Sequence, residues 1–206
     1  MEKKITFISE HNLLEGMLNC RSTSHGAVIT HPHPLYGGDM SNPVVECLAM
    51  SFNKKNYSTL RFNFRGVGGS EGTYDEGIGE QKDILAAIHF MLDQGISSIH
   101  LIGYSFGAWV IAQLKDIPQE IEALIFVSPP VALLPYQQDL SFPLLRMVIT
   151  GEEDEIAPAG LIEKSLADWN ASASLKIVDF ADHFFYGSFT ALDKIVGDYL
   201  SKNRTA

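Results

Sequence analysis

Short apolar runs alternate along the chain with longer segments in which apolar residues recur every three or four positions. Apolar runs of about four to eight residues bounded by glycine, proline or polar residues are typical of buried strands. The three-to-four spacing is typical of helices packed along one face. The runs predict strands at residues 5–9, 14–20, 26–30, 57–64, 99–102, 121–127, 144–150 and 175–180.

The segments with helical spacing lie between these strands. They predict helices at residues 44–53, 80–92, 108–114, 161–169 and 189–200. Asn42 followed by Pro43 is a capping side chain followed by a proline in the first turn, which places a helix start there. Strands alternating with helices predict an α/β fold, with a mostly parallel twisted sheet covered by helices on both faces. Functional loops of such sheets gather at the carboxyl ends of the strands.

Length and composition limit the remaining possibilities. A chain of 206 residues with 46% hydrophobic and 19% charged residues suits a single globular domain spanning residues 1–206. No apolar run reaches membrane-spanning length, and the first residues lack the apolar core of a signal peptide, so we expect a cytoplasmic protein with no membrane partner. The net charge of −10 argues against binding to nucleic acid. The acidic residues are scattered along the sequence and so do not indicate an acidic tail. Cys20 and Cys47 are expected to be reduced core thiols, and the protein a monomer or homodimer.

One turn combines several unusual requirements. The apolar run 99–102 leads into Gly103-Tyr104-Ser105-Phe106-Gly107 and then directly into a helical segment. A G-x-S-x-G turn between a buried strand and a helix is a nucleophile elbow, in which the serine takes a strained backbone conformation. The flanking residues are glycines because a Cβ at either position would collide with neighbouring chain. The alternative is an ordinary strand–turn–helix that happens to carry a serine.

Two later loops carry the partners that a serine nucleophile needs. A run of four acidic residues, 152–155, follows one predicted strand, and His183 follows the next. A serine hydroxyl becomes nucleophilic when a histidine accepts its proton and a carboxylate orients that histidine. An acidic cluster is also typical of a solvated turn, and His183 among aromatic residues could be a core histidine. The order serine, acid, histidine along the chain is that of the α/β-hydrolase triad.

From about Leu14 to Leu200 the sequence resembles the α/β-hydrolase superfamily, and within it the small cap-less bacterial hydrolases related to dienelactone hydrolase. The resemblance lies in the elbow, in the histidine loop, and in the acid loop. Gly151-Glu152-Glu153-Asp154 followed by Ala157-Pro158 matches the pattern G-x-x-D-x-x-V-P, with Ala157 in place of the valine. It implies that Ser105 is the nucleophile, Asp154 the acid and His183 the base, with Glu153 the alternative acid. No cofactor is implied.

The segment His31-Pro32-His33-Pro34 resembles the oxyanion loop of the same family, H-G-x-P. An oxyanion hole needs two backbone N–H donors, one of them from the residue after the nucleophile, Phe106. Pro32 and Pro34 have no N–H, so His33, at the family's donor position, is the expected second donor. A metal pair of His31 and His33 is the weaker alternative, because no cysteine and few acidic residues accompany them. We expect no metal. His31 and Arg65 are expected to brace their loops, and for Arg65 the alternative is a clamp for a substrate carboxylate.

The interval between the strands ending near Ser128 and starting near Leu144 is too short for a helical cap. We therefore expect an open pocket bounded by Tyr36, Tyr104, Leu134 and Phe184, with Phe106 and Pro130 beside them. The expected function is a serine hydrolase that cleaves small carboxylic esters or thioesters through an acyl-enzyme. The alternatives are a non-catalytic binding module of the same fold, and an amidase or peptidase.

Overall fold

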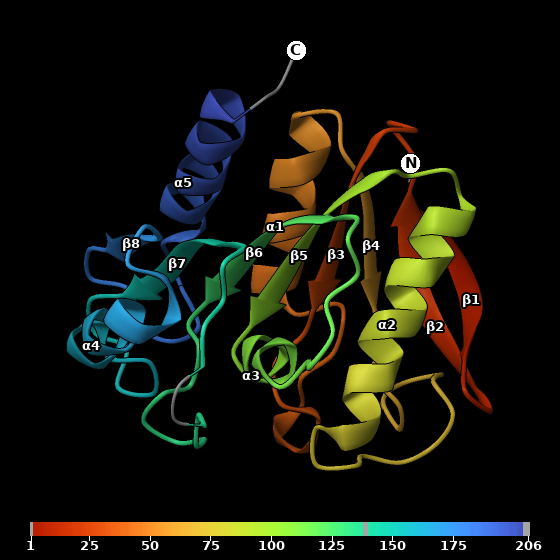
Figure 1. The fold of residues 1–206 in the computed structure, drawn as a ribbon, viewed down its shortest axis with the longest axis horizontal. Coiled ribbons are helices and arrows are strands. Elements are labelled where there is room, and N and C mark those ends of the chain that lie inside the picture. Colours follow the sequence, from red (N-terminus) through yellow and green to blue (C-terminus); the bar gives the residue numbers. More distant parts are fainter. Residues whose placement is uncertain (1, 138–139, 204–206) are drawn as a thin grey trace.

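The structure is a computed structural model that describes residues 2–137 and 140–203 (Figure 1). Strands in this part of the chain form one eight-stranded sheet in the order β1-β2-β4-β3-β5-β6-β7-β8. Their bounds are β1 Lys3–Ser9, β2 Asn12–Asn19, β3 His25–Thr30, β4 Ser58–Phe62, β5 Ser98–Tyr104, β6 Ile121–Val127, β7 Leu145–Gly151 and β8 Ser174–Val178.

The sheet is parallel from β4 to β8, and the antiparallel pair β1–β2 extends it beyond β4. The chain leaves the central strand β3 for β4 on one side and then returns for β5 on the other. Loops that follow strands on either side of such a reversal diverge and leave a crevice at the carboxyl ends of the strands. The loop after β3 and the turn after β5 border this crevice.

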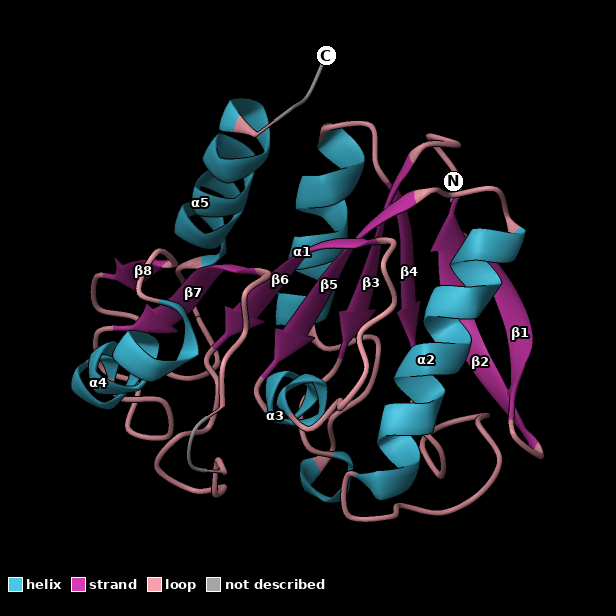
Figure 2. Ribbon diagram, viewed as in Figure 1, coloured by secondary structure: helices cyan, strands magenta, loops and turns pink. Residues whose placement is uncertain are grey.

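Five helices in the described chain cover the two faces of the sheet (Figure 2). Helices α1 (Pro43–Lys54) and α5 (Phe189–Lys202) pack on one face, and α2 (Ile78–Asp93), α3 (Phe106–Ala112) and α4 (Ala159–Asn170) on the other. Successive strand residues point to opposite faces, so Leu101 packs in the core under α2 and α3 whereas Ile102 packs in the core under α1 and α5. The predicted architecture is confirmed.

The differences from the sequence-based expectations are local. The strand expected at 57–64 ends at Phe62, and the loop after β3 contains a short 3₁₀ turn, Pro34–Tyr36. Cys47 is buried as expected, but Cys20 is exposed because β2 ends one residue before it. Residues 128–137 and 140–144, between β6 and β7, contain no helix, which confirms the absence of a cap. Within the described ranges no helix has the length and apolar character needed to cross a membrane.

Candidate active site

Ser105 lies in the tight turn between β5 and α3, with φ 52° and ψ −118°. Non-glycine residues rarely adopt a positive φ, and they do so where the surrounding structure enforces it. At the two flanking positions there is no room for any side chain, so both must be glycine. A Cβ at Gly103 would lie 2.4 Å from the Cα of Ala108, and one at Gly107 would lie 2.2 Å from Oγ1 of Thr30. The turn therefore has the geometry that the glycine spacing predicted.

His183 connects Ser105 to Asp154. Its Nε2 lies 2.9 Å from Oγ of Ser105, and its Nδ1 lies 2.9 and 3.0 Å from the two carboxylate oxygens of Asp154. All three residues are buried, although they come from loops after three different strands. Glu153, the alternative acid, is exposed to solvent. The structure thus brings together the three residues that the motifs selected.

Asp154 is held as a carboxylate. Burial favours its neutral form, but the hydrogen bond from His183, the electrostatic interaction with that ring and the N–H of Ala157 outweigh burial, so the pKa of Asp154 lies below its usual value. The Oδ1 atom accepts the N–H groups of Ile156 and Ala157 at 3.0 and 2.7 Å. A carboxylate fixed in this way can orient the imidazole and stabilise its protonated form.

The acid loop and the histidine loop are packed tightly against each other. A Cβ at Gly151 would lie 2.1 Å from the carbonyl oxygen of Ala181, so only glycine fits there. The N–H of Glu153 donates to the same carbonyl at 2.9 Å. The hydroxyl of Tyr104, the last residue of β5, donates to the carbonyl of His183 at 3.0 Å. These contacts fix where His183 lies relative to Ser105.

Phe106 and His33, the expected oxyanion donors, lie on adjoining loops. Their rings are in contact, with centroids 4.7 Å apart. Among the described residues neither backbone N–H has a hydrogen-bond acceptor. The loop that carries His33 is held by hydrogen bonds from the N–H groups of Tyr36 and Gly38 to the His33 carbonyl, at 3.1 and 3.0 Å. Two free N–H groups therefore flank the Ser105 turn.

His31 and Arg65 support the loops around the site. His31 is fully buried, its Nε2 accepts the N–H of Phe64 at 3.1 Å, and its Nδ1 lies 2.7 Å from the carbonyl of Pro32. Burial lowers the pKa of His31 to about 4, so the ring is neutral near pH 7. Arg65 is also buried, and its guanidinium lies 2.8 Å from Asp83. Both side chains therefore brace the structure, as expected. No group of three or more potential metal ligands occurs in the part of the chain that the structure describes.

A pocket of about 570 Å³ opens above Ser105 and His183. All four residues expected to bound it, Tyr36, Tyr104, Leu134 and Phe184, are among its lining residues. Tyr104 lies differently from expectation, because its side chain is fully buried in the core below the pocket and its hydroxyl is engaged by His183. Four further lining residues were not expected, because residue spacing does not show which parts of separate loops and of a helix start meet at the pocket: Pro32, Asn42, Leu133 and Ile156.

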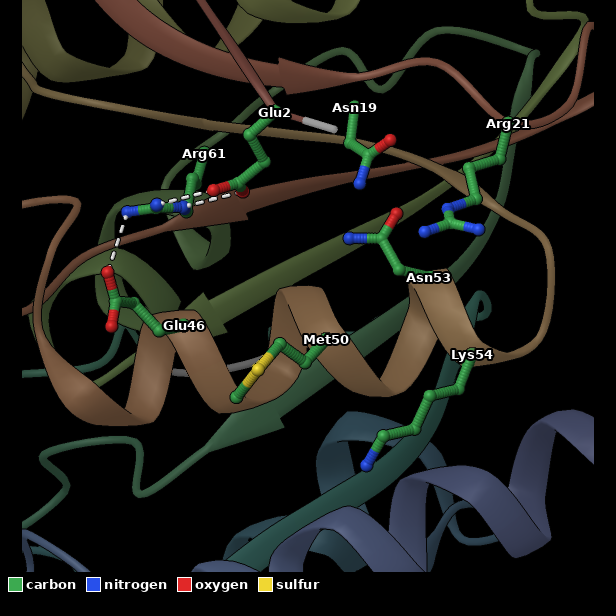
Figure 3. A pocket seen from close by; sticks show the side chains of 8 residues that line it. All are labelled: Glu2, Asn19, Arg21, Glu46, Met50, Asn53, Lys54 and Arg61. Carbon is green, nitrogen blue, oxygen red and sulfur yellow. Dashed lines mark hydrogen bonds and ion pairs between the residues drawn. The ribbon is translucent and has the colours of Figure 1, made fainter.

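A second pocket of about 550 Å³ lies between α1 and the strands β2 and β4, away from Ser105 (Figure 3). Seven of its eight described lining residues are polar or charged. Arg61 forms ion pairs there with Glu2 and Glu46, at 2.7 and 3.3 Å. No serine, cysteine or histidine lines it among the described residues, so the chemistry outlined above belongs to the Ser105 pocket.

Comparison with known proteins gives consistent results. The sequence profile of the "Alpha/beta hydrolase family" matches residues 25–199. A curated relative, an uncharacterized protein of Rickettsia prowazekii (strain Madrid E), is 36% identical over 185 residues, covering 84% of this chain and 77% of that protein.

Solved structures of similar shape include an alpha-beta serine hydrolase homologue from Coxiella burnetii, with a TM-score of 0.87, 30% identity and coverage of 96% of this chain and 97% of the other. An a/b serine hydrolase without lid from Xanthomonas campestris has a TM-score of 0.87 and 26% identity over 100% of this chain and 97% of the other.

Proposed function

Because this chain belongs to the alpha/beta hydrolase family, we propose that it is a serine hydrolase that cleaves small carboxylic esters or thioesters with Ser105, His183 and Asp154. The observation that carries the proposal is the position of His183, whose two ring nitrogens lie 2.9 Å from Ser105 and 2.9 Å from Asp154. A histidine placed between a serine and a carboxylate can take the serine proton while the carboxylate stabilises its charge.

In the proposed reaction, Oγ of Ser105 attacks the carbonyl carbon while its proton moves to Nε2 of His183. The resulting oxyanion accepts hydrogen bonds from the N–H groups of Phe106 and His33. Removal of one such donor costs about 3–4 kcal/mol in comparable enzymes. The intermediate collapses to acyl-Ser105, and His183 gives its proton to the departing alcohol or thiol. A water molecule, activated by His183, then releases the acid and restores Ser105.

The pocket favours small acyl groups. It is about 570 Å³ in volume, and two of its lining residues, Tyr36 and Phe184, are exposed to solvent. With no helix in the described residues between β6 and β7, an extended chain would leave the pocket into water. The same openness offers no gate for peptides, which makes a peptidase the weaker alternative. A purely binding role would not require the hydrogen bonds that align Ser105, His183 and Asp154.

The proposal is tested by labelling the purified protein with a fluorophosphonate and by assaying 4-nitrophenyl acetate, a thioester and an anilide of the same acyl group. We expect Ser105 to be labelled and the ester to be hydrolysed, and Ser105→Ala to lose both properties. Since the three residues act together, adding His183→Ala to Ser105→Ala should have little further effect. Labelling of a different serine, located by mass spectrometry, would contradict the proposal.

A further inference from the structure

Charge is distributed unevenly between the two edges of the sheet. The loops that follow the parallel strands surround Ser105, and together they are called the carboxyl edge here: residues 31–42, 63–77, 128–137, 151–158 and 179–188. The carboxyl edge carries ten carboxylates and one cationic side chain, Arg65, whereas the rest of the chain carries fifteen carboxylates and fourteen cationic side chains. Nearly all of the net charge of −10 therefore lies at the carboxyl edge, the side of the sheet on which the Ser105 pocket opens.

The single cation of this edge does not offset the carboxylates. Arg65 is buried, and its guanidinium is paired with Asp83 at 2.8 Å and with Glu10 at 3.4 Å. Other cations, among them Arg21, Lys54 and Arg61, surround the separate pocket between α1 and β2–β4 (Figure 3). An approaching molecule therefore meets uncompensated negative charge at the mouth of the Ser105 pocket.

The carboxylates lie beside the lining of the pocket and not within it. No aspartate, glutamate, lysine or arginine is among its described lining residues. Three exposed carboxylates, Glu152, Glu153 and Glu155, border an adjoining hollow that also includes Asp154. Glu155 directly precedes Ile156, which lines the Ser105 pocket. Negative charge beside an uncharged pocket acts on the approach and orientation of a substrate.

Exposed aromatic rings at the mouth of the pocket are a second feature that favours a positively charged substrate. Tyr36 and Phe184 both line the pocket while remaining 86% and 48% exposed. Tyr186, 69% exposed, lies against Phe184 with ring centroids 5.9 Å apart. The face of an aromatic ring attracts a cation, and ammonium groups are recognised in this way. Exposed rings among carboxylates can therefore hold a positively charged group at the pocket mouth.

We propose that the substrates of this site are esters that carry a positive charge, an ammonium or quaternary ammonium group, near the bond that is cleaved. The inference rests on the proposed function, since it assigns a substrate class to the same site. The ester group would lie in the uncharged pocket at Ser105, and the cation would lie at the rim among the aromatic rings and carboxylates. Esters and thioesters that carry carboxylate or phosphate groups would be repelled by the same edge.

The test uses three phenyl acetates that differ only in the meta substituent of the ring: trimethylammonium, tert-butyl or carboxylate. The first two groups have nearly the same shape, so their comparison isolates charge. At low ionic strength we expect kcat/KM to fall in the order cation, neutral, anion, with about a tenfold difference between cation and anion. At 1 M salt, where charges are screened beyond about 3 Å, the difference should largely disappear.

Two double variants distinguish the effect of carboxylates at the carboxyl edge from the effect of the overall net charge. Glu153→Gln with Glu155→Gln removes two exposed carboxylates beside the pocket, and should lower the preference for the cation about threefold. Asp93→Asn with Asp116→Asn removes two exposed carboxylates at the opposite edge of the sheet, and should leave the preference unchanged. Equal kcat/KM for the three esters, or equal effects of the two variants, would overturn the charge inference alone. Absence of hydrolysis of all three esters would instead overturn the proposed function.

Discussion

The hydroxyl of Tyr104 donates a 3.0 Å hydrogen bond to the backbone carbonyl of His183, so the residue before Ser105 holds the loop that carries its partner. The two rings also lie close together in a tilted arrangement, with centroids 5.7 Å apart and an interplanar angle of 31°. Burial raises the pKa of Tyr104 well above its usual value, which keeps the hydroxyl protonated and able to donate. The elbow therefore positions both the nucleophile and the histidine.

Replacing Tyr104 with Phe tests this positioning. The variant keeps the buried ring but leaves the carbonyl of His183 without its donor, which should lower the free energy of unfolding by about 1 kcal/mol. If the bond positions His183, kcat for 4-nitrophenyl acetate should fall about tenfold, since small displacements of reacting groups are costly, while KM changes little. Urea denaturation and steady-state kinetics measure the two effects. A loss of stability with unchanged kcat would mean that Tyr104 has only a structural role.

Asp154 and Glu153 provide a matched pair for testing the acid. Asp154→Asn should fold normally and lose about 10⁴ in kcat, by analogy with serine proteases, because the amide favours the wrong tautomer of His183. Glu153→Gln changes an exposed side chain and should leave kcat near the wild-type value. If Glu153→Gln is the inactive variant, the acid has been assigned to the wrong residue.

The open pocket predicts the response to acyl chain length. Methylenes that enter a pocket contribute about 0.8 kcal/mol each, whereas those that remain in water contribute nothing. For 4-nitrophenyl esters, kcat/KM should therefore peak between acetate and butyrate and level off or fall by octanoate. A steady rise up to dodecanoate, measured below the concentration at which the ester aggregates, would require a longer groove than the 570 Å³ pocket provides.

Two buried histidines predict how stability depends on pH. Burial lowers the pKa of both His31 and His100 to about 4, whereas in the unfolded chain each takes up a proton below about pH 6.5. Between these values the unfolded state binds more protons, so the free energy of unfolding decreases as the pH falls. The loss at pH 5 relative to pH 8 should be about 2 kcal/mol for each histidine, measured by urea denaturation.

His100→Phe provides the control for this pH dependence. His100 packs among the rings of Phe52, Tyr57 and Tyr199, and its Nδ1 has no partner among the described residues. Phe preserves the ring contacts and removes the titrating group, so about half of the loss between pH 8 and pH 5 should disappear. An unchanged pH dependence would show that His100 is not responsible.

The order of strands and helices and the Ser105 turn could be predicted because their signals are local. Apolar runs, the capping Asn42 and the glycines at 103 and 107 act through near neighbours in the chain. Even Tyr104 could have been placed correctly from local periodicity, because a strand residue two positions from Ile102 faces the same core.

Other features depend on contacts between distant segments. Leu133 and Ile156 line the pocket because their loops meet, and the N–H of Ala132 donates to the carbonyl of Ile156 at 3.1 Å. The acidic residues are scattered along the sequence, but the parallel topology gathers ten of them at one edge. Neither feature can be derived from residue spacing without knowing which strands are neighbours.

The backbone of Ser105 has φ 52° and ψ −118°, a conformation that activity requires and that lowers the stability of the fold. A side chain held in such a conformation costs about 1–3 kcal/mol that glycine would not incur. The residue that reacts is therefore one that selection for stability alone would replace. Engineering that ranks substitutions by thermostability will favour Ser105→Gly, so position 105 must be kept constant for activity to survive. The same substitution would yield a robust, inert version of the protein in which substrates could be captured without being cleaved.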